Sequence, residues 1–341
     1  MVAMSGGIDS TITAYLLQNR GYEIEGVYMK LHNSPSYHEK NIQNIEKVTK
    51  FLNIKYHILD LSFEFDKEVY YPFIETYKKG LTPNPCVICN RKIKLGKLVE
   101  FAKEKQFDFL ATGHYAKIKD GFIYEAKDKK KDQSYFISNI KKENIPNIIF
   151  PLGDMYKDEI KKIAENIDVL KEFATQKEST EICFVENSYI DILSEHFDVN
   201  KRGLVQNMSG DIIGEHRGYM HYTIGKRKGF TLKQAHTPHY VLQIDAKNNT
   251  IVVGSKDELK VKNFLIKDLN MFVKGKVFNT YVKIRYRSPK VKCILSIKED
   301  DSAVVELNEP VEGLAPGQAA VFYDDDKVIG SGWIIGEIKN G

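Results

Sequence analysis

A six-residue loop near the start of the chain constrains the fold more than any other feature. Ser5-Gly6-Gly7-Ile8-Asp9-Ser10 follows a short apolar strand, Met1 to Met4, and precedes a stretch with apolar residues at helical spacing. The two glycines allow a tight turn that brings backbone N–H groups close to an anion, and the helix adds the positive end of its dipole. Ser5 and Ser10 add hydroxyl donors, and Asp9 can hold Mg²⁺ or cap the helix. The sequence therefore predicts a phosphate-binding loop between a strand and a helix.

This loop differs from a Walker A sequence, because it lacks the Gly-Lys-[Ser/Thr] ending and its γ-phosphate lysine. A cradle of this kind suits a departing pyrophosphate better than a transferred γ-phosphoryl group. The arrangement resembles that of PP-loop ATP pyrophosphatases, which use ATP to adenylate a carbonyl oxygen. The alternative is an ordinary strand-to-helix turn, and the loop alone leaves the substrate open.

Composition favours a soluble globular protein of two or three domains, since 341 residues exceed the usual size of a single core. No stretch reaches the ~18 apolar residues of a membrane span, and no apolar leader with a cleavage site is evident. We therefore expect a cytoplasmic protein. Four cysteines in a chain of this length do not indicate a disulfide scaffold.

Strand and helix patterns alternate over about the first 115 residues, which predicts a doubly wound parallel α/β sheet. The resemblance of the loop implies that this sheet is of the PP-loop, adenine nucleotide alpha hydrolase-like type. Asp120-Gly121 predicts a hairpin turn, and from Gly203 short strands replace the helices. Alternation at Tyr281 to Arg287, Val291 to Ile297 and Ala303 to Leu307 predicts an antiparallel β-barrel. We expect an ATP-binding catalytic domain at 1–200, a small β-rich central domain at 201–260 and a C-terminal β-barrel at 261–341.

Basic residues gather in three clusters, although the formal net charge is only +4. Lys127 to Lys142 holds six lysines and two aspartates, and Lys283 to Lys292 holds five basic residues and no acid. Arg217 with Lys226-Arg227-Lys228 lies near Tyr219 and Tyr222. Basic clusters interleaved with tyrosines favour nucleic-acid binding, although each one alone is typical of a solvated face.

The cysteines form the second informative pattern. In Thr82-Pro83-Asn84-Pro85-Cys86-Val87-Ile88-Cys89-Asn90, we expect Asn90 to cap a helix and the helix dipole to stabilise the Cys89 thiolate. Cys183 lies between helical patterns, whereas Cys293 alternates with apolar residues and is expected in the barrel core. A zinc site would need four ligands, and the chain has no second C-x-x-C pair to complete them. A redox-active pair and inert buried thiols are two further alternatives. We favour catalytic roles for Cys89 and Cys183.

Several ordered motifs carry a resemblance to the tRNA-specific 2-thiouridylases over nearly the whole chain. They are Ser5 to Ser10, Asn84-Pro85-x-x-x-Cys89-Asn90, Ala111 to Ala116, Lys131 to Phe136, Cys183, Tyr222 to Gly229, Ile284 to Arg287 and Ala315 to Gln318. In that family ATP adenylates O2 of the wobble uridine, position 34 of tRNA. A sulfur atom carried as a cysteine persulfide then displaces AMP, and pyrophosphate is the other product.

The resemblance implies roles for individual residues. Cys89 would be the nucleophile and Cys183 the persulfide carrier, with a transient disulfide between them. ATP and Mg²⁺ would be held by Ala3, Met4, Ser5, Gly6, Gly7, Ile8, Asp9, Ser10, Met29 and Gly113. The tRNA would be contacted by Asn84, Pro85, Cys86, His114, Lys131, Asp132, Gln133, Arg285, Tyr286 and Gln318. A persulfide-carrying donor protein is the second expected partner.

Cys86 departs from the family pattern, in which many members have aspartate at this position. Cys86, Cys89 and Cys183 could instead hold an iron–sulfur cluster, such as [4Fe-4S], with one iron left open for sulfide. Persulfide and cluster chemistry therefore remain alternatives. Another PP-loop tRNA or nucleotide ligase is a rival enzyme, and a non-catalytic tRNA-binding protein is a rival of a different class.

Overall fold

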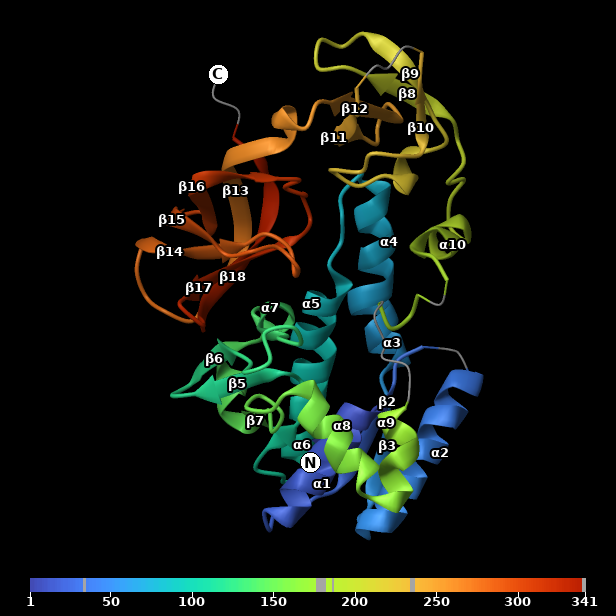
Figure 1. Ribbon diagram of the computed structural model, residues 1–341, viewed down its shortest axis with the longest axis vertical. Coiled ribbons are helices and arrows are strands. Elements are labelled where there is room, and N and C mark those ends of the chain that lie inside the picture. The colour runs from blue at the N-terminus through green and yellow to red at the C-terminus, as the bar shows by residue number, and fades with distance from the viewer. Residues whose placement is uncertain (33–34, 176–181, 186, 234–236, 339–341) are drawn as a thin grey trace. The chain divides into compact units, whose positions relative to one another are not determined.

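The structure is a computed structural model that describes residues 1–32, 35–175, 182–185, 187–233 and 237–338 (Figure 1). The chain divides into two compact units. The first comprises Met1–Tyr70, Cys86–Thr180 and Asp325–Ile329, and the second comprises Tyr71–Pro85, Glu181–Asp324 and Gly330–Gly341. Within the described ranges, none of the helices is long and apolar enough to cross a membrane.

The first unit contains a five-stranded sheet in the order β3-β2-β1-β4-β7, and each strand pairs in parallel with its neighbours. The strands are β1 (Val2–Ala3), β2 (Gly26–Lys30), β3 (Tyr56–Asp60), β4 (Leu110–Ala111) and β7 (Ile148–Ile149). The predicted doubly wound α/β sheet is confirmed. Its central strand is very short, because the chain turns into the phosphate loop directly after Ala3.

Helices α1 (Ile8–Asn19), α2 (Pro35–Leu52) and α8 (Lys157–Glu165) share one apolar core with the sheet. Ile12 of α1, Ile45 of α2 and Ile160 of α8 are each fully buried in it. These residues lie at helical spacing with other apolar positions, so the cost of leaving that face in water keeps the three helices on the sheet.

Further elements of the first unit surround this core. The hairpin of β5 (Ala116–Lys119) and β6 (Phe122–Glu125) turns at Asp120-Gly121, as predicted. Both turn residues have positive φ, which is the conformation that this dipeptide favours. The remaining helical segments are α3 (Ser62–Phe65), η1 (Asp66–Tyr70), η2 (Asn90–Lys97), α6 (Leu98–Glu104), α7 (Ser134–Ile137), η3 (Lys142–Asn147), η4 (Asp168–Leu170) and α9 (Lys171–Ala174).

The second unit contains a five-stranded mixed sheet in the order β10-β9-β8-β12-β11. Its strands are β8 (Gly203–Gln206), β9 (Ile212–His216), β10 (Phe230–Leu232), β11 (Tyr240–Asp245) and β12 (Thr250–Gly254). Val205, Val241 and Ile251 are buried in a small core of their own. The predicted β-rich central region is confirmed. Helices α4 (Tyr71–Lys78) and α10 (Tyr189–Ser194) and the turns η5 (Tyr219–His221) and η6 (Asp257–Leu259) complete this part of the unit.

A six-stranded antiparallel barrel follows in the order β13-β16-β15-β14-β17-β18, and pairing of β13 with β18 closes it. The strands are β13 (Lys260–Met271), β14 (Val277–Lys283), β15 (Val291–Ile297), β16 (Ser302–Glu312), β17 (Ala319–Asp324) and β18 (Lys327–Glu337). The predicted barrel is confirmed, and Cys293 lies buried in it, where burial raises the pKa of its thiol to about 12. The predicted strand Tyr281 to Arg287 is wrong at its end. The chain turns after Lys283, and the N–H of Ser288 donates to the carbonyl of Arg285 at 3.1 Å.

Candidate active site

The phosphate loop links the carboxyl end of β1 to α1, the edge at which open parallel sheets bind ligands. Gly7, which has no side chain to cap a helix, precedes Ile8, the first residue of α1. The Ser10 hydroxyl donates to the Gly7 carbonyl at 3.0 Å and accepts the Ser5 N–H at 3.1 Å. Gly6 has a φ of +79°, and an added Cβ would lie 2.9 Å from the Asn41 carbonyl oxygen. The loop is thus closed on itself, and the dipole of α1 points into it.

The structure brings the other predicted ATP-binding residues to the same edge. Gly113 follows β4, and a Cβ there would lie 2.9 Å from the carbonyl carbon of Asp9 and 3.0 Å from the nitrogen of Ser10. Met29 is half-buried near the carboxyl end of β2. The side chains of Met4 and Ile8 are buried, so a ligand in the loop would meet only their backbone groups.

Lys157 is a candidate residue of this site that the sequence reasoning missed. Its Nζ donates to Oδ1 of Asp9 at 2.6 Å, and the Tyr115 hydroxyl donates to the same oxygen at 2.7 Å. The Lys157 side chain is only 7% exposed. The sequence could have indicated this residue, because Lys157 is the first residue of the helix that follows β7. That helix begins at the edge of the sheet where ligands bind. Lys157 thus brings a cation to a loop that contains none.

The helix that carries the cysteines begins earlier than predicted. Helix α5 runs from Pro85 to Cys89 and continues without a break through η2 and α6 (Figure 1). The predicted cap at Asn90 is wrong, since the fixed φ of Pro85 suits the first helical position. The Asn90 amide instead donates to the Phe136 carbonyl at 3.1 Å. The helix dipole therefore acts more on Cys86, in the first turn, than on Cys89.

The three cysteines of interest differ in exposure. Cys86 is half-buried, Cys89 is buried and Cys183 is exposed. Cys183 lies in a turn of the second unit in which the Val185 N–H donates to the Ile182 carbonyl at 2.9 Å. The neighbouring Phe184 ring packs edge-on against Phe73 of α4, with ring centroids 5.2 Å apart. In the described part of the chain, His, Cys, Asp and Glu side chains nowhere gather in a group of three that could hold a metal ion.

The residues of the first unit that were predicted to contact tRNA make many contacts within that unit. The Asp132 carboxylate is buried, which raises its pKa, and it accepts hydrogen bonds from the N–H of Ala126 and the hydroxyl of Ser134. Gln133 Oε1 accepts the Tyr115 N–H at 2.9 Å. Lys131 is half-buried. The structure therefore gives both side chains a supporting role, Asp132 toward Ala126 and Ser134 and Gln133 toward Tyr115.

His114 is half-buried between Thr112 and Phe150. Its Nδ1 lies 2.7 Å from the Thr112 hydroxyl, and its ring meets the Phe150 ring edge-on at 5.8 Å between centroids. Burial, and to a smaller extent the charge of Lys94, lower the pKa of His114 to about 3. The imidazole is therefore neutral at physiological pH.

Five predicted tRNA-contacting residues belong to the second unit. Arg285 donates from Nη2 to the carbonyls of Ile224 at 3.1 Å and Gly313 at 2.5 Å, which joins the mixed sheet's region to the barrel. Tyr286 is half-buried, with Lys283 Nζ 5.9 Å from its ring centroid. Asn84 is buried, and its amide lies 3.4 Å from Oε1 of Gln318. Pro85, also buried, is the first residue of α5.

Two lysine–tyrosine pairs lie at the barrel, and they differ in exposure, because the Tyr323 ring is fully buried and Tyr281 is half-buried. Lys290 Nζ lies 5.1 Å from the Tyr323 ring centroid, and Lys292 Nζ lies 5.9 Å from that of Tyr281. The third predicted cluster does not form a comparable open surface. Tyr222 is buried in the core of the mixed sheet, and Lys226 Nζ donates to the His221 carbonyl at 2.7 Å.

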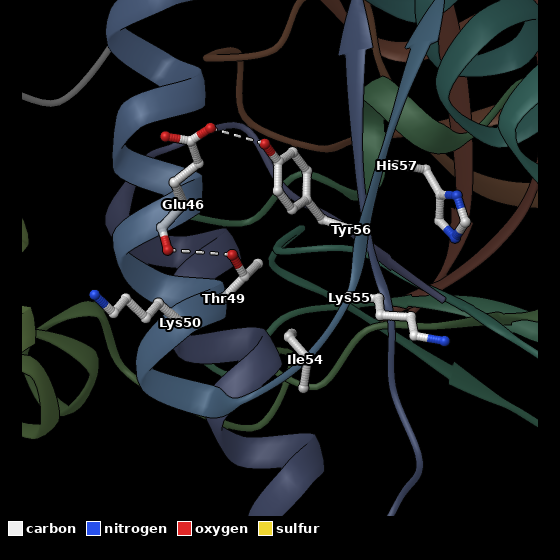
Figure 2. Close-up of a pocket in the computed structure, with 7 residues that line it drawn as sticks. All are labelled: Glu46, Thr49, Lys50, Ile54, Lys55, Tyr56 and His57. Atoms are coloured by element: carbon white, nitrogen blue, oxygen red, sulfur yellow. Dashed lines mark hydrogen bonds between the residues drawn. The ribbon is translucent and has the colours of Figure 1, made fainter.

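Figure 2 shows an open pocket between α2 and β3. Its lining includes Glu46 and Thr49 of α2 and Tyr56, the first residue of β3, whose hydroxyl donates to Glu46 at 3.0 Å. Because the pocket lies at the amino end of a parallel strand, it is at the edge of the sheet opposite to the loop. The pocket is therefore separate from the candidate site.

Three family models match successive parts of the chain. Residues 1–187 match a tRNA methyl transferase HUP domain, residues 190–255 a tRNA methyl transferase PRC-barrel domain, and residues 257–334 an aminomethyltransferase beta-barrel domain. Curated relatives match 98% of the chain, and their names describe thiolation of uridine, whereas the names of these models describe methyl transfer.

The tRNA-specific 2-thiouridylase MnmA of Campylobacter lari is 58% identical over 334 residues, which cover 98% of this chain and 99% of that protein. The protein of the same name from Nitratiruptor sp. is 58% identical over 335 residues and 98% of each chain. That from Campylobacter jejuni (strain RM1221) is 56% identical over 334 residues, covering 98% of this chain and 99% of the relative. At this identity over essentially the full length, the chain belongs to the family of tRNA-specific 2-thiouridylases.

Proposed function

We propose that this protein catalyses the ATP-dependent 2-thiolation of the wobble uridine, position 34, of tRNA. The single observation that carries the proposal is full-length similarity to 2-thiouridylases, 58% identical to the Campylobacter lari protein. The phosphate loop with its neighbouring lysine and the cysteine-bearing helix supply the chemical groups that this reaction needs.

In the first step, O2 of the uridine attacks the α-phosphorus of ATP, and pyrophosphate leaves. The N–H groups at the start of α1, together with Ser5, Ser10 and Gly113, would hold the phosphates, with Met29 at the nucleoside end. Asp9 is the group in the loop suited to Mg²⁺, because carboxylate oxygens are its preferred protein ligands. Lys157 lies 2.6 Å from that carboxylate, where its charge would stabilise the departing pyrophosphate.

In the second step, the terminal sulfur of a Cys183 persulfide attacks C2 of the uridine, and AMP leaves. The Cys89 thiolate then attacks Sγ of Cys183, which releases the thiolated base and leaves a Cys89–Cys183 disulfide. An external thiol reductant must reopen this disulfide, and a persulfide-carrying donor protein must reload Cys183. Because the uridine carbonyl is a poor electrophile, adenylation has to precede sulfur attack, and this explains why one chain has both a phosphate loop and two thiols.

For tRNA binding, we propose the lysine and tyrosine residues of the barrel together with Lys131. Half-buried tyrosine rings with an ammonium group nearby would suit both the phosphate backbone and unstacked bases. The pairs Lys283–Tyr286 and Lys292–Tyr281 have this arrangement, each with 5.9 Å between Nζ and the ring centroid. Removing the wobble base from its stack costs about a few kcal/mol, which contacts of this kind would offset.

Iron–sulfur chemistry is a second candidate, favoured by one observation, the half-buried thiol of Cys86 one helical turn before Cys89. With Cys183, these two thiolates would make a three-cysteine ligand set that leaves one iron open to sulfide. Metal content distinguishes it from the persulfide reaction.

The test is nucleoside mass spectrometry of tRNA after incubation with the protein, ATP, Mg²⁺ and a persulfide donor. We expect 2-thiouridine at position 34, with AMP and pyrophosphate in equal amounts, and no product without ATP. Cys293→Ala, in the barrel core, is the matched thiol control and should retain the activity. Iron and acid-labile sulfide in anaerobically purified protein would establish the cluster instead. If the protein bound tRNA but formed neither AMP nor pyrophosphate, the proposed reaction would be wrong and the protein would be a non-catalytic tRNA-binding protein.

A further inference from the structure

The chain segment that leads into the cysteine helix is held by a loop of the barrel. This segment, Thr82–Asn84, and the barrel loop, Ala315–Gln318, both belong to the second unit. The Thr82 N–H donates to the Pro316 carbonyl at 2.9 Å. Gln318 Nε2 donates to the carbonyls of Thr82 at 3.2 Å and Pro83 at 2.9 Å, while its Oε1 lies 3.4 Å from the donating amide of Asn84.

The chemistry of the segment explains why it needs an external partner. Pro83 and Pro85 have no N–H group, so the backbone here offers carbonyls but few donors. Thr82 is half-buried and Pro83 is buried, and a carbonyl removed from water without a donor is costly. The two N–H bonds of the Gln318 amide meet this need at two successive carbonyls.

The barrel loop itself is rigidly placed. The Gly317 N–H donates to the Ile334 carbonyl, and the Ile334 N–H donates to the Gln318 carbonyl, each at 2.9 Å. Gly317 has a φ of +91°, and a Cβ there would lie 2.8 Å from the Thr82 carbonyl oxygen. The loop and the segment therefore approach as closely as their backbones permit.

We infer that Gln318 is a positioning residue that fixes the start of the helix carrying Cys86 and Cys89. Asn84 is joined directly to Pro85, the first residue of α5, so a displacement of Thr82–Asn84 would shift or fray the first turn of that helix. The inference rests on the proposed function in taking Cys89 as the working thiol. Both ends of the Gln318 amide are engaged within the protein, so a contact with tRNA alone does not account for this residue.

The test measures thiol alkylation in the full-length protein without tRNA. Iodoacetamide labelling, followed by peptide mass spectrometry, gives separate rates for Cys86, Cys89 and Cys183. In Gln318→Ala we expect labelling of Cys86 and Cys89 to accelerate about tenfold, because losing the equivalent of one net hydrogen bond changes a local opening equilibrium by about this factor. Cys183, on a separate turn, is the internal reference and should keep its rate.

Two further variants sharpen the result. Gln318→Glu keeps the size of the side chain but places a carboxylate against two carbonyl oxygens, so it should accelerate labelling in the same way even if the alanine variant folds poorly. Gln243→Ala, at an exposed position of β11, is the matched control and should label like the wild type. If both Gln318 variants were labelled at wild-type rates and bound tRNA more weakly, the inference would be wrong. The role of Gln318 would then be a contact with tRNA. This readout needs no thiolation, so its failure is distinct from that of the proposed function.

Discussion

At the scale of single residues, the contact between Asp9 and Lys157 is the main feature of the candidate site that the sequence patterns did not predict. Asp9 accepts two hydrogen bonds on one oxygen, from Lys157 and from Tyr115. The buried lysine charge is thereby balanced within the protein. In the proposed reaction, the Asp9 carboxylate would hold Mg²⁺ and the Lys157 ammonium group would contact the phosphates.

Replacing Lys157 with methionine should reduce adenylation of tRNA about 100-fold, since removing one preorganised donor from a developing charge has effects of this order. The expected loss is in the ATP-dependent step, measured as pyrophosphate release in the presence of tRNA. Lys162→Met, at an exposed position of the same helix, is the control and should release pyrophosphate normally. Normal release by a folded Lys157→Met protein would remove Lys157 from the site.

His114 makes stability depend on pH in a direction that follows from its environment. Its pKa is lowered from 6.5 to about 3 in the folded state, so the unfolded chain binds more protons between these values. The free energy of unfolding should therefore fall as pH drops below about 6.5 and should be unaffected by this group above it. The free energy of unfolding can be measured with urea at pH 8 and at pH 5. Between these two pH values it should fall by about 2 kcal/mol less in His114→Gln than in the wild type. His196→Gln, at an exposed position, should behave like the wild type.

At this scale, contacts could be predicted from the sequence only where the interacting residues are close together along the chain. The phosphate loop is contiguous, so its shape could be inferred from glycine and serine spacing. Lys157 approaches Asp9 from 148 residues away, and no local pattern encodes that contact. Asp132 and Gln133 were recognised as a motif, but their bonds to Ala126 and Tyr115 depend on the folded chain.

At the scale of elements, the cysteine helix contains a π-helical stretch directly after Cys89, η2 (Asn90–Lys97). Such stretches are rare and frequently lie at functional sites. Gly96 permits this one, because a Cβ at that position would lie 2.6 Å from the Arg91 carbonyl oxygen. Arg91 in turn donates to the Asn139 carbonyl at 2.5 Å, which ties the helix to the segment after α7.

Gly96→Ala should therefore disturb the helix that carries the thiols. We expect a loss of about 1–3 kcal/mol of stability from overpacking, seen as a lower melting temperature, and reduced thiolation at temperatures where the protein is still folded. Gly336→Ala, whose added Cβ meets no atom within 4 Å, is the control. Equal melting temperatures and thiolation rates in the two variants would contradict this account of the π-helical stretch.

Sequence patterns predicted the type of most elements, because apolar periodicity and turn residues are local. The strand Val291–Ile297 and the hairpin at Asp120-Gly121 were obtained in this way. The start of the cysteine helix was missed, since Asn90 is a good capping residue in isolation. The π-helical stretch has no comparable local signal, since it depends on one glycine meeting a carbonyl five residues earlier.

At the scale of the whole molecule, the chain forms two units, and the residues proposed for chemistry belong to both. The phosphate loop and Cys89 lie in the first unit, and Cys183 and the barrel lie in the second. The barrel and the doubly wound sheet were predictable as separate folds, whereas the boundaries at 200 and 260 stay a prediction. In the proposed reaction, Cys89 and Cys183 must meet, so catalysis requires both units in one chain.

The most direct test of this claim separates adenylation from sulfur transfer in the Cys183→Ser variant. With tRNA, ATP, Mg²⁺ and a persulfide donor, the variant should still release pyrophosphate and form adenylated tRNA, because the phosphate loop is intact. Nucleoside mass spectrometry should detect no 2-thiouridine in that tRNA, whereas the wild-type protein should form it at position 34. Formation of 2-thiouridine by Cys183→Ser at the wild-type rate would contradict the account.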